Sequence, residues 1–121
     1  MKRSLVCFFF AALLAGCGNS NSGSAESKPP APKDPEVEKG LALVAAHGCY
    51  SCHQVDQPSA GPAYTAVAAK YPANAQVIDS LAQKIIKGGA GNWGTVTMIA
   101  HPNVSQEDAR TMVKYVLSLK K

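Results

Sequence analysis

The sequence lacks several features that would indicate common classes of protein. After residue 34 it contains a single pair of cysteines, at positions 49 and 52, whereas a structural zinc site typically takes four ligands in two pairs. Besides the histidine that follows this pair, only His47 and His101 are available as extra donors. The chain also shows no strand-like alternation of useful length, which a thioredoxin-type dithiol in a βαβ unit would require. Little else in the chain looks catalytic.

A strong excess of charge is also missing. The 121 residues include 12 basic and 8 acidic side chains. Loss of Lys2 and Arg3 with a cleaved leader leaves ten basic residues against eight acidic ones, a net charge of +2. So small an excess gives no reason to expect nucleic-acid binding. The length allows one domain rather than two, and we expect a monomer.

The beginning of the chain has the features of an export signal. Two basic residues precede an apolar run from Leu5 to Ala15, which is too short to span a bilayer as a permanent helix. The run ends in L-A-G-C, with Cys17 as its last residue, and this segment resembles the lipobox of bacterial lipoproteins. A simple secretory signal with an incidental cysteine is the alternative. We therefore expect a lipoprotein signal peptide over residues 1–16 and an extracytoplasmic protein anchored to a bacterial membrane through lipid on Cys17.

The segment that follows the lipobox has the composition of a linker. From Gly18 to Asp34 it reads "GNSNSGSAESKPPAPKD", with no aromatic or branched aliphatic residue. Such a segment buries too little apolar surface to offset the entropy lost on ordering. We therefore assign residues 17–34 to the lipidated cysteine and a flexible linker, and residues 35–121 to the folded domain.

The domain is predicted to be all-α, with about four helices. Asp34 as N-cap and Pro35 at the first helical position mark the first helix, and Gly88 with Gly89 ends the third. The last helix begins at Ser105 with a capping box in which an aspartate replaces the usual glutamate or glutamine, and its buried face consists of Ala109, Met112, Val113 and Val116. The predicted ranges are 35–46, 64–71, 75–87 and a helix from residue 105 toward the C-terminus.

Two long segments without helical signals separate these helices. They read "CHQVDQPSAGPA" over 52–63 and "GGAGNWGTVTMIAHPN" over 88–103. Loops of that length in a small domain are usually functional. Four short helices also make a thin core by themselves. We therefore expect something other than side chains to fill the middle of the domain.

The stretch "HGCYSCH" over 47–53 contains the motif C-x-x-C-H. Its two cysteines lie on one side of a turn, so both sulfur atoms can reach one object. A disulfide between Cys49 and Cys52 would close a loop too short to stabilise the fold much. The motif is instead typical of covalent c-type haem attachment, in which two thiols add to the haem vinyl groups and His53 supplies the proximal iron ligand.

The ligand on the other side of the iron has four candidates. Met112 lies on the apolar stripe of the last helix, where methionine usually belongs to the core. His47 is too close to the motif in sequence to reach the opposite side easily. Met98 and His101 both lie in the long loop after the third helix, which can fold over the far side of the haem.

Several motifs across the domain resemble class I cytochromes c, and in particular their short bacterial subgroup. They are C-Y-S-C-H at 49–53, G-P-A-Y at 61–64 followed by "VAAKY", I-I-K-G-G at 85–89, W-G-T-V-T-M at 93–98 and the closing "VKYVLSLKK". The resemblance implies a small monohaem fold in which about four helices surround one covalently bound haem c.

The resemblance also implies roles for individual residues. It makes His53 the proximal ligand and the Met98 sulfur the distal one, with the Pro62 carbonyl accepting the other ring N–H of His53. Trp93 corresponds to a residue whose indole N–H reaches a haem propionate, and Lys84 falls where the subgroup often has an arginine near the propionates. Gly40 and Tyr115 resemble the small and aromatic residues at which the first and last helices cross.

The chain departs from the subgroup directly after Met98. Prolines usually follow the methionine there, then an asparagine, whereas this chain has Ile99-Ala100-His101 before Pro102-Asn103. This change places a histidine near the expected iron and makes His101 the main rival to Met98. It also leaves open whether Asn103 supports the methionine sulfur.

The predicted function is one-electron transfer between respiratory redox partners, without catalysis. The donor and acceptor would be redox proteins such as an oxidase, a reductase, a peroxidase or a quinol-oxidising complex. We expect them to dock on a small, mainly apolar patch around Ala60 and the Met98 loop, because the net charge is low. The alternative is a haem c enzyme or sensor, peroxidase-like or gas-binding, which requires Met98 to be absent from the iron or easily displaced.

Overall fold

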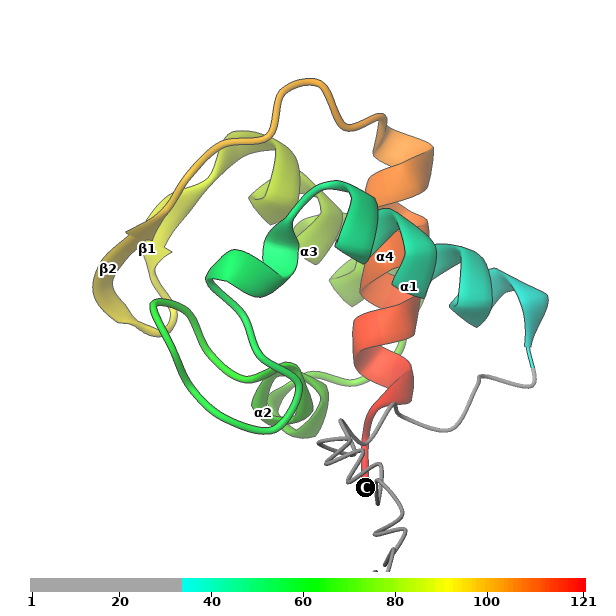
Figure 1. Cartoon of the computed structure of the whole chain (residues 1–121), viewed down its shortest axis with the longest axis horizontal. Helices are drawn as coiled ribbons and strands as arrows, with labels where there is room; N and C mark the ends of the chain where they lie inside the picture. Colours follow the sequence, from blue (N-terminus) through cyan, green and yellow to red (C-terminus); the bar gives the residue numbers. More distant parts are fainter. Residues whose placement is uncertain (1–33) are drawn as a thin grey trace, which may run out of the picture.

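The computed structural model of the protein describes residues 34–121, which form four α-helices and one short hairpin (Figure 1). The helices are α1 (Pro35–Ala46), α2 (Tyr64–Lys70), α3 (Ala75–Lys87) and α4 (Gln106–Ser118); a 3-10 turn, η1 (Cys49–Ser51), follows α1, and the strands are β1 (Gly89–Gly91) and β2 (Gly94–Met98). The predicted signal peptide over 1–16, the lipid on Cys17 and all of the linker except Asp34 lie outside the described residues. Among these residues, none of the helices combines the length and the apolar character that a membrane span requires.

The helix ends follow local signals in the sequence. The Asp34 carboxylate accepts a hydrogen bond from the Glu36 N–H at 2.8 Å, as expected of an N-cap. Helix α2 ends at Lys70, one residue before the predicted end, because Tyr71 precedes a proline and is extended. At α4 the Ser105 hydroxyl accepts from the Asp108 N–H at 3.0 Å and donates to the Asp108 carboxylate at 2.8 Å, so the capping residue is the predicted one.

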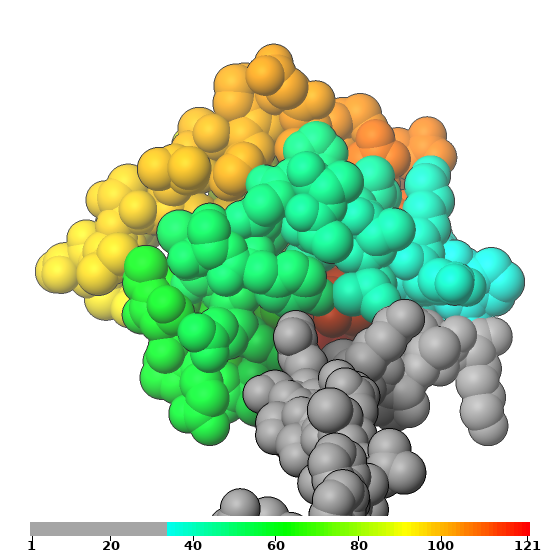
Figure 2. Space-filling view, viewed as in Figure 1, coloured from blue at the N-terminus to red at the C-terminus, as the bar shows by residue number. Residues whose placement is uncertain are grey.

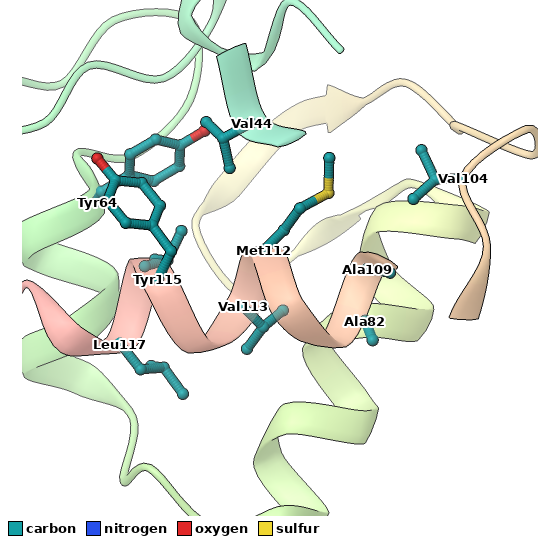
Figure 3. Packing of buried hydrophobic residues seen from close by; sticks show 10 residues of the cluster. Val44, Tyr64, Ala82, Val104, Ala109, Met112, Val113, Tyr115 and Leu117 are labelled. Carbon is teal, nitrogen blue, oxygen red and sulfur yellow. The ribbon is translucent and has the colours of Figure 1, made fainter. Parts of the chain in front are cut away.

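Helix α4 forms the centre of the core, since it packs against α1, α2 and α3. Figure 3 shows Met112 and Tyr115 extending from one side of α4, the side where Val44 lies, while Val113 and Leu117 extend from the other. The predicted buried positions of this helix are all buried. Thr111, Tyr115 and Leu117 are buried as well, because a helix with neighbours on several sides buries more than one stripe.

The crossing of α1 and α4 depends on a glycine. A Cβ added to Gly40 would lie 2.7 Å from the Tyr115 Cβ and would overlap the Thr111 carbonyl oxygen. The backbones of the two helices therefore approach more closely than any side chain at position 40 would permit. This is the small and aromatic pair that the resemblance implies.

The hairpin formed by β1 and β2 is not predicted by the sequence pattern. Its strands pair in antiparallel fashion, with Gly89 opposite Met98 and Gly91 opposite Gly94, and the Asn92-Trp93 pair forms its tip. Gly91 and Gly94 on either side of the tip have φ values of 115° and 102°, a region that favours glycine. Figure 1 shows the hairpin as a yellow arm at the edge of the helical body, beyond η1 and α3. It closes one side of the site described next.

Candidate functional site

The two cysteines of the C-x-x-C-H motif lie on a single tight turn. Gly48, with φ 66°, ends α1 and lets the chain enter η1. The Cys52 and His53 N–H groups then both donate to the Cys49 carbonyl, at 3.2 and 3.0 Å. Both cysteines are free thiols, Cys49 half-buried and Cys52 exposed, and burial raises the pKa of the Cys49 thiol. The turn therefore presents two thiols and a histidine within one short segment.

The His53 ring is held by the loop that follows it. Its Nδ1 lies 2.8 Å from the Pro62 carbonyl oxygen, and because a carbonyl can only accept, Nδ1 must carry the proton. This is the hydrogen bond that the resemblance implies. Among the described residues the other ring nitrogen, Nε2, has no hydrogen-bond partner. The structure thus fixes the tautomer that leaves Nε2 free to bind a metal.

Two further residues fix the plane of the His53 ring, and neither role is predicted from the sequence. A Cβ on Gly61 would lie 2.8 Å from Nδ1, so only glycine lets the loop pass this close to the ring. The Tyr64 ring stacks against the imidazole with centroids 5.3 Å apart and planes 10° from parallel. Both residues belong to the G-P-A-Y segment, whose hydrogen bonds to the motif include the Gly61 N–H to the Cys52 carbonyl at 2.8 Å.

One large cavity, of about 850 Å³, brings the predicted site residues together. Its size falls within the range of pockets that hold cofactors. Its lining is mainly apolar and comes from η1, the loop after it, α2, α3, the hairpin and α4. Figure 2 shows the teal and green segment from the motif to α2 in the middle and lower left of the view, with the yellow hairpin beside it. The predicted site residues that line the cavity are Cys49, Cys52, His53, Pro62, Lys84, Trp93 and Met98.

The lining of this cavity also distinguishes among the other candidate iron ligands. His101 and Met112 also line it, whereas His47 and Asn103 do not. Met112 is 1% exposed and belongs to the core cluster, as its place on the apolar stripe predicts. Asn103 is exposed. His101, which lies in the loop after β2, is therefore the candidate that remains beside the cavity in addition to Met98.

The backbone around Met98 is held against the end of α3. Gly88, with φ 68°, ends that helix, and a Cβ there would lie 2.5 Å from the Met98 carbonyl oxygen and 2.8 Å from the Ala100 backbone nitrogen, closer than real Cβ atoms come. The His101 N–H donates to the Ile85 and Ile86 carbonyls at 3.1 and 3.2 Å. The segment that carries Met98 is thus fixed to α3 at its base.

Two lysines contact the hairpin that carries Trp93 and Met98. The Lys84 ammonium donates to the Ala90 carbonyl at 3.3 Å, and its contact with a haem propionate stays a prediction. Lys70, which the sequence does not single out, donates to the Asn92 carbonyl at 2.8 Å and lies 4.4 Å from the centre of the Trp93 ring. Trp93 itself is 42% exposed at the cavity edge.

A group of tyrosines supports the motif from the side of the core. The hydroxyl groups of Tyr50 and Tyr115 are 2.9 Å apart, which ties η1 to α4. The Tyr64 ring meets both of the others edge to face, with centroid separations of 5.8 and 6.4 Å. Burial raises the pKa of the Tyr50 and Tyr64 hydroxyls, so both groups stay protonated at neutral pH.

The residues around the cavity fit a haem c better than a metal ion alone. Within residues 34–121 no three His, Cys, Asp or Glu side chains cluster as ligands for a metal ion. The two thiols instead lie at the edge of an apolar cavity beside an oriented imidazole, and apolar side chains of α3 such as Leu81 and Ile85 are only half-buried against it. An apolar group in this space would complete their burial.

Comparison with known proteins gives consistent matches. The model of the family described as cytochrome c matches residues 37–120. Cytochrome c-551 of Azotobacter vinelandii is 42% identical over 83 residues, which are 69% of this chain and 100% of that protein. Cytochrome c-551 of Pseudomonas aeruginosa is 44% identical over 89 residues, 73% of this chain and 79% of that protein. The crystal structure of wild-type Nitrosomonas europaea cytochrome c552 matches with a TM-score of 0.62 and 38% identity, covering 66% of this chain and 99% of that chain.

Proposed function

Since this chain belongs to the cytochrome c family and is therefore a haem c electron carrier, we propose that His53 and Met98 supply the two protein ligands to its iron. Family membership also confirms the predicted cofactor, one covalently bound haem c. The observation that supports the ligand assignment is that two segments distant in the sequence lie beside the same cavity. The C-x-x-C-H turn and the hairpin that ends at Met98 come from separate parts of the chain and line one apolar cavity.

Each protein group has a defined part in this proposal. Cys49 and Cys52 tether the cofactor, and His53 binds through Nε2 while Nδ1 donates to the Pro62 carbonyl. When bound, the haem iron stores one electron by changing between its ferrous and ferric states. Donation to the carbonyl makes the imidazole a stronger base and holds its orientation. The apolar lining excludes water. It also favours the ferrous over the ferric state of the iron, because the ferrous state carries less charge.

The fixed geometry suits electron transfer rather than catalysis. His53 is held by Pro62 and Tyr64, and the Met98 segment is held against α3. With both His53 and Met98 bound to the iron, no site on the iron remains for a substrate. We therefore propose that the chain is not an enzyme. Little in these held segments has to move when one electron is gained or lost, which keeps exchange with a partner fast.

The surface beside the cavity suits a weakly charged redox partner. Within residues 34–121 the large exposed hydrophobic side chains are Trp93, Val96 and Ile99, with 42%, 65% and 68% of their surfaces exposed. All three belong to the hairpin or follow it directly, and all line the cavity, as does Ala60. We propose that this apolar patch is where electron donors and acceptors dock. The rate of electron transfer with a partner should then change little between low and high salt, and a steep fall with salt would contradict the proposal.

We further propose that the domain works outside the cytoplasm, attached through lipid on Cys17 to a bacterial membrane. Bacterial c-type cytochromes generally function there. Metabolic labelling with a radioactive fatty acid would test the attachment. Labelled protein that loses its label in a Cys17→Ser variant supports it, and unlabelled wild-type protein contradicts it.

The ligand proposal is tested by the visible spectrum of the ferric protein. A sulfur-to-iron charge-transfer band at the far-red edge is expected in the wild type and should vanish in Met98→Ala. His101→Ala is the matched control, since His101 lines the same cavity from the same segment, and it should keep the band. If the wild type has no such band, Met98 is not the ligand. A band that persists in Met98→Ala would also contradict the proposal, because the sulfur bound to the iron would then belong to another residue.

A further inference from the structure

The tip of the hairpin is attached to α2 through one side chain. Lys70 is the last residue of α2, and its ammonium donates to the Asn92 carbonyl at 2.8 Å. The same ammonium lies 4.4 Å from the centre of the Trp93 ring, within the range of a cation–π contact. Asn92 and Trp93 are the two residues that connect β1 to β2. One lysine therefore holds both residues of the hairpin tip.

The position of this contact matters because the hairpin has few other anchors. Its base is fixed where Gly88 and the His101 N–H meet α3, and Lys84 contacts Ala90 on β1. Residues 90–97 are otherwise exposed. Figure 1 shows the tip extending away from this base toward the part of the molecule where α2 lies. If the hairpin were held only at its base, its tip would be free to move away from the cavity.

We propose that Lys70 is a positioning residue, a clasp that closes the hairpin over the cavity and thereby keeps Met98 in its binding position. The inference rests on the proposed ligation by Met98. Met98 is the last residue of β2, paired with Gly89. Its backbone is held at the base, so a movement of the tip would act on the direction of its side chain through the strand that leads to it. Lys70 does not touch the cofactor in this account. It acts through Asn92 and Trp93.

The expected effect is modest, because these groups are exposed. Each of the two contacts contributes little at such a site. Together we expect their loss to increase the population of the open hairpin about tenfold. That change is measurable without unfolding the protein, since neither contact belongs to the core cluster.

The test compares three variants of the haem-loaded protein. Lys70→Met removes the charge and the donor but keeps most of the apolar stem, and Lys70→Arg keeps both the charge and donors. Lys87→Met is the matched control, because Lys87 is likewise an exposed lysine in the last turn of its helix, α3. This control separates the clasp from the general effect of a basic residue at a helix C-terminus.

Two readouts are needed. The first is hydrogen exchange of the amides of residues 89–98, and the second is the affinity of the ferric protein for added imidazole, which competes with Met98. Lys70→Met should raise both about tenfold, while Lys70→Arg and Lys87→Met stay near the wild type. If hairpin exchange or imidazole affinity is unchanged in Lys70→Met, the clasp is refuted.

Failure of the ligand proposal would be visible separately. It would appear as a missing far-red band in the wild-type protein, before any Lys70 variant is made. In that case hydrogen exchange alone decides whether Lys70 holds the hairpin, because this readout does not depend on the identity of the iron ligand.

Discussion

Replacing Gly61 with alanine should damage the site through the His53 ring. The added Cβ would lie 2.8 Å from Nδ1 and 2.9 Å from Nε2, and would overlap Cε1, whereas an ordinary Cβ contact is 3.4–4 Å. The loop cannot easily withdraw, because the Gly61 N–H donates to the Cys52 carbonyl at 2.8 Å and the Gly61 carbonyl accepts from Ser59 at 3.0 Å. The ring must therefore move away from Pro62.

The expected change in the free energy of unfolding of Gly61→Ala follows from three contributions. Overpacking of this kind costs about 1–3 kcal/mol, and a weakened His53–Pro62 hydrogen bond costs about 1 kcal/mol more. Alanine recovers about 0.4–1 kcal/mol by restricting the unfolded chain. We expect a net loss of about 2 kcal/mol in the free energy of unfolding. The midpoint potential should rise, because an imidazole that donates less strongly to the carbonyl is a weaker base toward ferric iron.

Gly48→Ala is the matched control for this prediction. Gly48 also adjoins the motif, but it has φ 66° and a Cβ there would meet nothing within 4 Å. Its replacement should cost about 1 kcal/mol through backbone strain alone and leave the potential unchanged. The assays are guanidinium unfolding and a redox titration of each haem-loaded variant. Equal potentials for Gly61→Ala and the wild type, together with equal stability, would refute the reasoning.

Three other predictions follow from the packing. Tyr50→Phe and Tyr115→Phe should show a coupling of about 0.5–1.5 kcal/mol in a double-mutant cycle of unfolding free energies, and strict additivity would contradict their hydrogen bond. Gly40→Ala should destabilise by about 1–3 kcal/mol because of the α1–α4 crossing; a gain of about 1 kcal/mol, as helix propensity alone predicts, would contradict it. Burial raises the pKa of Tyr50, so its protonated hydroxyl stabilises the fold fully below the unfolded-state pKa of about 10 and progressively less above it. Stability measured across that pH range should fall less steeply in Tyr50→Phe than in the wild type.

The helices were predictable because their signals are local. Asp34 and Pro35 at the start of α1, Gly88 after α3 and Ser105 before α4 act through their own backbone geometry. The sequence also predicted which residues gather at the site, since the motif and the family resemblance name them. The fold class and the haem c are confirmed, while the individual ligand roles remain predictions.

Other features depend on contacts between distant segments and carried no local signal. The hairpin is made of strands of three and five residues, too short for an alternating pattern. Tyr50 occupies a variable position inside the motif, and its partner Tyr115 is far along the chain on α4. The contact of Lys70 with the hairpin tip likewise joins two elements whose relative placement only the fold supplies.

The central claim, that the protein is an electron carrier with both iron positions taken by its own residues, is tested most directly by carbon monoxide. The measurement is the rate and extent of its binding to the reduced, haem-loaded protein at neutral pH. Met98 held by the α3 contacts and the hairpin predicts slow and incomplete binding. Rapid and complete binding would contradict the claim and favour a haem enzyme or a gas sensor.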